Sequence, residues 1–289
     1  MRHTLIDSPP AEQSPITIHE RIMGSIIGGC VGDALGTPLE WSPKKNLDES
    51  LDDFGVLEMS EGGGTMCCVM ESLISCKGFY VEDVAERLLD WYLQAPEGVS
   101  PTTIYALELM AEGYEWHEAS IKVLGNHPAM SGAGCLPRCV PLAALYHNQA
   151  EALQSASDAC ARITHQSVHS RRYAILYSQI ISLALTGKQI NIELFSPSYV
   201  RPRAFEYVAS CINSLTFQSF KDAMEWGLSL GGNTGILGSC VGALSGARFG
   251  MRGVPKEWFF ALRDRKRIEE LALGVVELMM SNEDDGVDL

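Results

Sequence analysis

Two stretches of the chain carry a glycine at every fourth position, and this spacing constrains the fold more than any other feature. The first array consists of Gly24, Gly28, Gly32 and Gly36, and the second of Gly238, Gly242, Gly246 and Gly250. In an α-helix, residues four apart share a face, so each array forms a smooth groove that another backbone can approach. Each glycine costs a helix about 1 kcal/mol relative to alanine, which close packing has to offset. We therefore expect the two helices to pack on each other or on a common neighbour, with Asp33 and Asn233 in one neighbourhood.

Helical periodicity dominates the rest of the chain. Thr17-Ile18-His19-Glu20 is a capping box, which predicts that a helix begins near Ile18. Further helices are expected over Val81–Gln94, Ser100–Met110, Gln149–Ile163, Arg171–Leu185, Pro202–Leu215, Lys221–Leu230, Lys256–Arg263 and Ile268–Met280. Alternating segments typical of strands are nearly absent. The pattern predicts an all-α fold of ten or more helices.

The length of 289 residues suits a single globular domain. Residues 1–16 are polar and proline-bearing, and we expect them to form a flexible N-terminal arm. The domain is expected over 17–281, with an acidic tail over 282–289.

Composition narrows the class of protein. The net charge of −14 argues against a nucleic-acid binder, which needs a basic surface, and is compatible with a basic protein partner. The nine cysteines include no C-x-x-C pair, which indicates buried thiols in a reducing compartment. No signal-like segment is evident, and no apolar run reaches the ~18 residues of a membrane span. We expect a cytoplasmic protein with no membrane partner.

Four glycine-containing segments and one polar helix end are candidates for a functional site. They are Gly32–Glu40, Gly62–Glu71, Ser131–Arg138, the region around Asn233-Thr234, and Arg162–Gln166. A loop with backbone N–H groups and an arginine suits an anion, and so does the N-terminus of a helix.

Each candidate also has a purely structural interpretation. Asp33 can either cap a helix or belong to a functional site, and both interpretations stay open. The glycines 62–64 can be a plain connector, Cys67 can be a buried small residue, and His165 can be a structural histidine. No single segment is specific, but their order along the chain is.

That order resembles the ADP-ribosylglycohydrolase family, from about Ile18 to Pro255. Gly32–Glu40 matches the family motif G-D-A-L-G-x-P-x-E in full. Thr65–Met70 is aligned with T-D-D-T-x-M, and Gly132–Pro141 with G-N-G-x-x-M-R-x-x-P. Thr164-His165 matches a T-H pair, and Gly231–Ala243 is aligned with G-G-D-T-D-T-x-G-A-x-x-G-A.

The resemblance implies an all-α fold with a cleft that holds two magnesium ions. In the family, the T-D-D-T and G-D-T-D-T motifs supply the ligands, and the glutamate matching Glu40 sits over the metals. This chain departs from the pattern at five ligand positions, Met66, Cys67, Asn233, Gly235 and Ile236, and keeps only Thr65.

Magnesium requires hard oxygen ligands, mostly carboxylates, and a thioether, a thiol or a glycine cannot supply them. One thiolate without histidine partners is also poor material for zinc. We therefore predict no metal cofactor, and no hydrolysis by the family mechanism.

The cleft implied by the resemblance is expected to keep part of its ligand-binding surface. The candidate ligand-binding residues are Thr65, Gly132, Gly134, Arg138, His165, Asn233 and Thr234. An ADP-ribose-like group is the ligand that the family implies. Ala133 stands where the family has an asparagine, and Pro137 lacks an N–H, so both weaken this expectation.

Three hypotheses of function follow. The leading one is a pseudoenzyme that acts by binding, as an immunity protein that blocks the active site of an ADP-ribosyltransferase, or as a binder of an ADP-ribosylated protein. The alternative is a metal-independent ADP-ribosyl hydrolase with Glu40 or Asp33 as the base. The third is a structural or regulatory protein whose cleft is filled.

Overall fold

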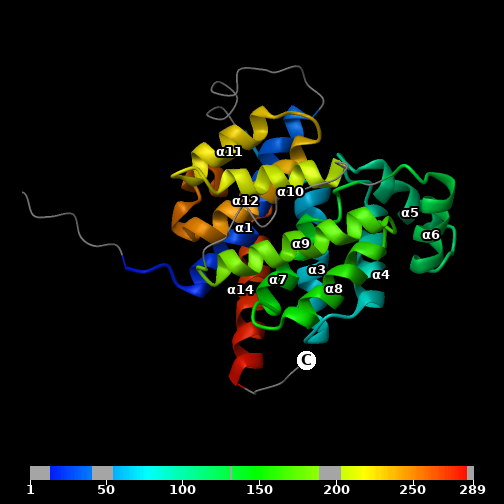
Figure 1. Ribbon diagram of the computed structural model, residues 1–289, viewed down its shortest axis with the longest axis horizontal. Helices are drawn as coiled ribbons and strands as arrows, with labels where there is room; N and C mark the ends of the chain where they lie inside the picture. The colour runs from blue at the N-terminus through cyan, green and yellow to red at the C-terminus, as the bar shows by residue number, and fades with distance from the viewer. Residues whose placement is uncertain (1–13, 41–54, 131, 189–202, 285–289) are drawn as a thin grey trace, which may run out of the picture.

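The computed structural model describes residues 14–40, 55–130, 132–188 and 203–284, and within these residues the chain is a bundle of helices (Figure 1). The α-helices are α1 (Ile18–Gly36), α3 (Glu61–Cys76), α4 (Val81–Tyr92), α5 (Pro101–Ala111), α6 (Trp116–Asn126), α7 (Val140–Leu145), α8 (Ala150–Arg162), α9 (Val168–Leu185), α10 (Arg203–Ser214), α11 (Phe220–Ser229), α12 (Thr234–Phe249), α13 (Lys256–Ala261) and α14 (Arg265–Asp284). Short 3-10 turns lie at Thr37–Leu39, Pro137–Cys139 and Met251–Gly253. No strand occurs in these ranges, only a bridge between Leu57 and Leu262, which confirms the all-α prediction.

The two glycine-rich helices, α1 and α12, pack against each other at the centre of the bundle. A methyl group added at Gly24 would lie 2.5 Å from the carbonyl oxygen of Gly246, and one at Gly28 would lie 2.5 Å from that of Gly242. Contacts at increasing residue numbers of α1 fall at decreasing residue numbers of α12, so the two helices are antiparallel. This pairing confirms that the glycine arrays exist to bring two backbones together.

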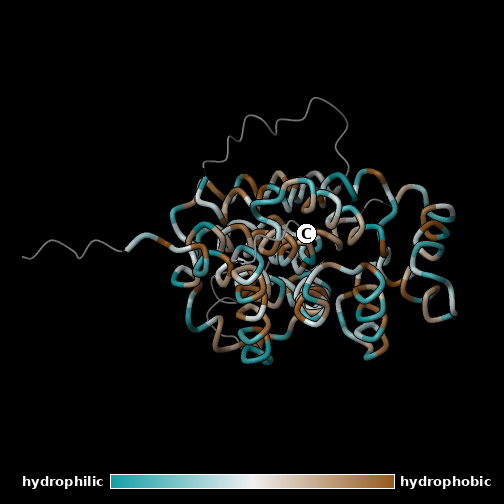
Figure 2. Tube along the Cα trace, turned by 90° about the horizontal axis from the view of Figure 1, so that it is seen from below, coloured by the Kyte–Doolittle hydropathy of each residue, from teal (hydrophilic) through white to brown (hydrophobic). Residues whose placement is uncertain are grey.

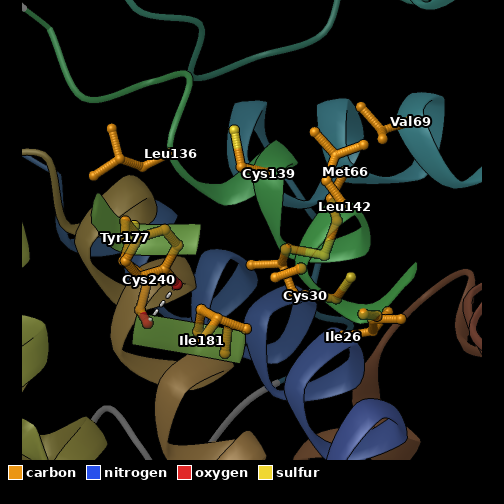
Figure 3. Close-up of a cluster of buried hydrophobic side chains, with 14 of the residues drawn as sticks. Ile26, Cys30, Met66, Val69, Leu136, Cys139, Leu142, Tyr177, Ile181 and Cys240 are labelled. Atoms are coloured by element: carbon orange, nitrogen blue, oxygen red, sulfur yellow. Dashed lines mark hydrogen bonds between the residues drawn. The ribbon is translucent and has the colours of Figure 1, made fainter. Parts of the chain in front are cut away.

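The apolar core surrounds this helix pair. Tyr177 of α9 is fully buried, and its hydroxyl donates to the Cys240 carbonyl oxygen at 2.9 Å (Figure 3). Met66 and Cys30 project into the same cluster (Figure 3). The helices α5 and α6 form a pair at one end of the molecule, which is visible from both directions (Figures 1 and 2).

Most helix bounds agree with the sequence pattern within a few residues. The capping box at Thr17 and Glu20 is present, with the Glu20 N–H donating to the Thr17 hydroxyl oxygen at 3.2 Å. The acidic tail was expected from 282, but α14 continues to Asp284, where Asn148 donates to the Glu283 carboxylate at 3.1 Å. Residues 1–13 of the expected arm and 285–289 of the expected tail lie outside the described residues.

Two sequence expectations need correction. The glycines 62–64 are not a connector but the first turn of α3, which begins at Glu61. In addition, the segment Ile18–Leu39 is long and apolar enough for a membrane span by length and composition, although 83% of that window is buried inside the protein. A central core helix of a folded domain passes the same test.

Candidate functional site

The amino terminus of α3 is capped by a carboxylate from α1. Asp33 is fully buried and accepts four hydrogen bonds. The Ser60 and Gly63 N–H groups donate to its Oδ2 at 2.6 and 2.9 Å. The Ser60 hydroxyl and the Gly62 N–H donate to Oδ1 at 2.9 and 3.2 Å. Asp33 therefore has the structural role that the sequence left as one of two readings, because every lone-pair direction of its carboxylate is engaged.

The start of α5 is held by a second carboxylate, that of Glu61. This side chain is fully buried and accepts from the Ser100 N–H at 2.7 Å and from the Thr103 hydroxyl. Ser100, the N-cap residue of α5, makes no side-chain cap hydrogen bond itself. Gly134 makes room for the arrangement, since a methyl group there would collide with Glu61 Oε1.

The amino terminus of α12 receives a third carboxylate. The Gly235 N–H donates to Glu40 Oε1 at 3.2 Å, and the Ile236 N–H donates to the side-chain oxygen of Asn233 at 2.9 Å. The Thr234 hydroxyl is buried and donates to the Gly36 carbonyl oxygen at 2.6 Å. Asn233 is therefore the helix cap, and Thr234 ties α12 to the end of α1.

The three capped helix starts meet around Ser60. The Thr37 hydroxyl donates to the Ser60 hydroxyl oxygen at 2.9 Å, and a methyl group at Gly235 would lie 3.2 Å from that same oxygen. Burial raises the pKa of Glu40 to about 7, an effect to which the charges of Asp33 and Glu61 add. Burial also raises the pKa of Asp33 and that of Glu61, against the hydrogen bonds they accept. The cluster thus concentrates negative charge at three helix N-termini, which carry partial positive charge.

A cleft of about 640 Å³ opens beside the starts of α5 and α12. Its size suits a small-molecule ligand. The lining residues are mostly apolar or aromatic, with a few neutral polar groups: Ser100, Pro101, Thr102, His127, Pro128, Ala129, Met130, Gly132, Ala133, Gly134, Tyr207, Asn233 and Ile236. The His127 ring stacks on Tyr105, with centroids 4.9 Å apart and an interplanar angle of 15°.

Arg138, expected to face an anion in the cleft, is instead fully buried behind it. Its Nη2 donates to the Cys160 carbonyl oxygen at 2.9 Å and to the Thr164 hydroxyl oxygen at 2.8 Å. The last carbonyl groups of a helix attract a cation, so α8 holds this guanidinium at its carboxyl end. Its Nε and Nη1 have no hydrogen-bond partner among the described residues.

His165 lies next to the loop that carries Gly132. Its Nδ1 lies 2.7 Å from the Thr164 hydroxyl, and its Nε2 is buried with no hydrogen-bond partner in the described part of the chain. A methyl group added at Gly132 would lie 3.0 Å from that Nε2. Burial lowers the pKa of His165 to about 3, helped by the charge of Arg138, so the ring is neutral at pH 7.

Thr65, Met66 and Cys67 do not face the cleft. The Thr65 hydroxyl donates to the Glu61 carbonyl oxygen within α3 at 2.7 Å. Met66 is a core residue, and Cys67 lines a different hollow on the other side of α3. At the start of α3, Ser60 approaches Gly235 and Gly62 approaches Ser239 of α12, and both precede Thr65–Cys67, where the sequence alignment placed the ligand motif.

The hollow beside Cys67 has a volume of about 400 Å³ and is lined by charged residues that pair with each other. Arg87 lies 3.7 Å from the Glu71 carboxylate, Arg267 also binds Glu71, and Arg263 binds Glu58. All three arginines of this hollow are thus paired with carboxylates, so the cleft between α5 and α12 is the better candidate site for a ligand.

The donor groups at the cleft do not suit a pair of magnesium ions. Asp33, Glu61 and Glu40 accept hydrogen bonds from N–H or O–H groups of the protein, and the Asn233 oxygen accepts the Ile236 N–H. Gly235 and Ile236 offer no side-chain oxygen. Within the described ranges, no three His, Cys, Asp or Glu side chains are arranged to hold a metal ion.

Several residues at this site escaped the sequence analysis. Glu61 and Ser60 stand directly before a glycine run, and a glutamate in the first turn of a helix is a common surface feature. His127, Tyr207 and Thr102 come from three separate segments and meet only in the folded chain. The one available signal was Ser100-Pro101, a helix start whose N–H groups require an acceptor.

The fold and the cleft define an all-α protein built on a central helix pair, with a ligand-sized cleft at the helix starts. Comparison with known proteins gives the family. The model of the ADP-ribosylglycohydrolase family matches residues 14–215 and 193–285, and the chain belongs to this family.

Individual relatives are distant but cover most of the chain. ADP-ribosylarginine hydrolase Tri1 of Serratia proteamaculans is 23% identical, over 92% of this chain and 82% of its own length. ADP-ribosylhydrolase ARH3 of Danio rerio is 21% identical, over 94% and 95%. A solved structure described as an ADP-ribosylglycohydrolase-related protein complex shares the fold, with a TM-score of 0.72 and 24% identity over 91% of this chain and 99% of that one.

Proposed function

We propose that this chain is a family member that acts by binding and not by magnesium-dependent hydrolysis. The observation that supports the proposal is the use of oxygen donors at the cleft. Asp33, Glu61 and Glu40 each cap the start of a helix, and the two α12 positions 235 and 236 carry no donor. The carboxylates nearest the site are thus used as acceptors for protein N–H and O–H groups.

The proposal includes a changed register for the first ligand motif. Two motifs that bind the same metal ions must lie close together, and Ser60 is the residue at the start of α3 that lies beside Gly235. A shift of four residues places the motif on Glu61-Gly62-Gly63-Gly64, directly after Ser60. In this register one carboxylate, that of Glu61, remains, but it is committed to Ser100 and Thr103. In this register Gly62 and Gly63, instead of Met66 and Cys67, stand at the two aspartate positions, and glycine likewise offers no side-chain ligand for magnesium.

Release of ADP-ribose tests the proposal directly. Relatives of this chain are named for acting on ADP-ribosylarginine. We expect no release above background from ADP-ribosyl-arginine or ADP-ribosyl-serine peptides, with or without magnesium. Release that magnesium stimulates would overturn the proposal.

A metal-independent hydrolase is a second candidate, favoured by one observation. Glu40 is half-buried at the cluster with a pKa of about 7, which is the range expected of a general base at neutral pH. Asp33 cannot take that role, since it is fully buried and saturated by four donors. Release without magnesium that is lost in Glu40→Gln, and kept in the exposed control Glu108→Gln, would establish this candidate.

The proposed partner is an ADP-ribosyltransferase whose active site the protein occludes. The acidic net charge of −14 supports a basic partner surface. We propose that the N-terminal segment inserts into that partner. Its described part, Ser14–Ile16, is anchored by Arg252, which donates to the Ser14 carbonyl oxygen at 3.0 Å. Removing residues 1–13 leaves that anchor in place. A weakened complex with the transferase is expected, and unchanged affinity would rule out insertion.

A further inference from the structure

Three helix starts that could bind phosphate are filled by carboxylates of the same chain. Backbone N–H groups at a helix N-terminus form a natural site for anions. In this protein Asp33 receives those of α3, Glu61 receives that of Ser100 before α5, and Glu40 receives that of Gly235 in α12. A phosphate arriving at any of these positions has to displace a carboxylate.

The described lining of the cleft offers a phosphate no cationic side chain. None of the described lining residues is a lysine or an arginine. Arg138, the guanidinium next to this region, is fully buried and bound to the α8 carbonyl groups and Thr164. Among the described residues, Glu61 accepts from the lining residue Ser100 and Glu40 accepts from Gly235, and these carboxylates repel a diphosphate.

The lining residues of the cleft favour the binding of an uncharged ring. His127, which stacks on Tyr105, and Tyr207 are the rings at the cleft, and Pro101, Met130 and Ile236 add apolar surface. Stacking of a planar ring on an aromatic side chain contributes about 1–3 kcal/mol. Asn233, Thr102 and Ser100 supply neutral polar groups for hydroxyls of a ligand.

We propose that this cleft binds an uncharged, ring-bearing small molecule of the nucleoside class and discriminates against ligands that carry a diphosphate. The inference rests on the proposed non-hydrolytic binding role and specifies its ligand. It also implies that the cleft does not serve to recognise an ADP-ribosylated protein, which leaves the outer surface for a transferase partner.

Calorimetry on the full chain, at pH 8 and low salt, tests the inference with adenosine, ADP-ribose and inorganic pyrophosphate as probes. We expect adenosine to bind at least roughly tenfold more tightly than ADP-ribose, because the shared ring gains the same contacts while the diphosphate meets negative charge. Pyrophosphate is expected not to bind. ADP-ribose binding as tight as adenosine, or no adenosine binding, would overturn the proposal.

Two variants isolate the electrostatic cause. Ala129→Arg adds a guanidinium at an exposed position of the lining, with Ala129→Gln as the uncharged control of similar length. Affinity for ADP-ribose should rise about tenfold with arginine alone, with adenosine unchanged. Glu40→Gln should raise ADP-ribose affinity about fivefold at pH 8, with Glu108→Gln as the distant control. An equal effect on both ligands would contradict the proposal.

This experiment is separate from the test of the proposed function. Magnesium-stimulated release of ADP-ribose would refute the non-hydrolytic role, whatever the calorimetry shows. Preference for ADP-ribose without any release would refute the ligand class alone.

Discussion

The α1–α12 interface and the cluster around Ser60 are neighbours that achieve close packing by opposite means. Along the contact between α1 and α12 the residues are glycines without side chains, and the two backbones touch at Gly28 and Gly242. Around Ser60 the side chains are kept, and three buried or half-buried carboxylates fill the space between helix starts. The first region tolerates no added atom, because carbonyl oxygens cannot move aside. The second can adjust, because flexible side chains form its contacts.

The sharpest test of this difference is Gly238→Ala, for which we expect the largest effect. A methyl group there would collide with the Gly32 carbonyl oxygen, which is backbone of the facing helix. The free energy of unfolding should fall by roughly 3 kcal/mol or more. Urea denaturation measures it.

Gly125→Ala is the matched control for that variant. Gly125 also lies inside a helix, α6, but nothing stands within 4 Å of the added methyl group. Alanine there should stabilise the protein by about 1 kcal/mol through helix propensity. Equal effects of the two substitutions would show that propensity and not packing governs the glycine array.

In the carboxylate cluster, Asp33→Asn should cost roughly 2 kcal/mol. The carboxylate accepts two donors on each oxygen, and an amide nitrogen would face two of those donors without an acceptor. Chemical denaturation gives the value. Asp90→Asn, at an exposed position of α4, is expected to change stability by less than about 0.5 kcal/mol. A result for Asp33→Asn as small as this control would argue against the capping role.

The pH dependence of stability reports on Glu40. Its pKa in the folded protein, about 7, lies above the ordinary value of 4.5, so folding favours its protonated form. Stability should therefore fall as the pH rises from about 4.5 to about 7, and then level off. Comparing unfolding curves of the unaltered chain and Glu40→Gln over that window should show a contribution of about 1 kcal/mol, reduced by solvent screening. A parallel pair of curves would contradict this assignment.

The smallest effect is expected for Gly235→Ala, three residues from Gly238 on the same helix. Its methyl group would lie 2.6 Å from Glu40 Oε1, which is the end of a flexible side chain that can swing aside. Helix propensity compensates for the lost contact, so the unfolding free energy should change by less than about 1 kcal/mol. Destabilisation as large as that of Gly238→Ala would mean that the cluster is as rigid as the helix interface.

Sequence patterns predict the parts of this protein that depend on local periodicity and backbone chemistry. The glycine spacing predicted the α1–α12 pair, the capping box fixed the start of α1, and motif order gave the family resemblance. These features succeed because each is encoded within one helical segment. The same local reading failed at glycines 62–64, where three residues without side chains look like a connector.

Contacts between distant segments establish what those glycines do and where the charged residues point. Asp33 turns glycines 62 and 63 into the first turn of a helix by accepting their N–H groups from a distance of about 30 residues in sequence. The fold also places Arg138 behind the cleft instead of inside it, since the carbonyl groups at the end of α8 attract the guanidinium. Hydrogen-bond partners far apart in the chain carry no periodic signal, so only the folded structure reveals that the carboxylates are occupied.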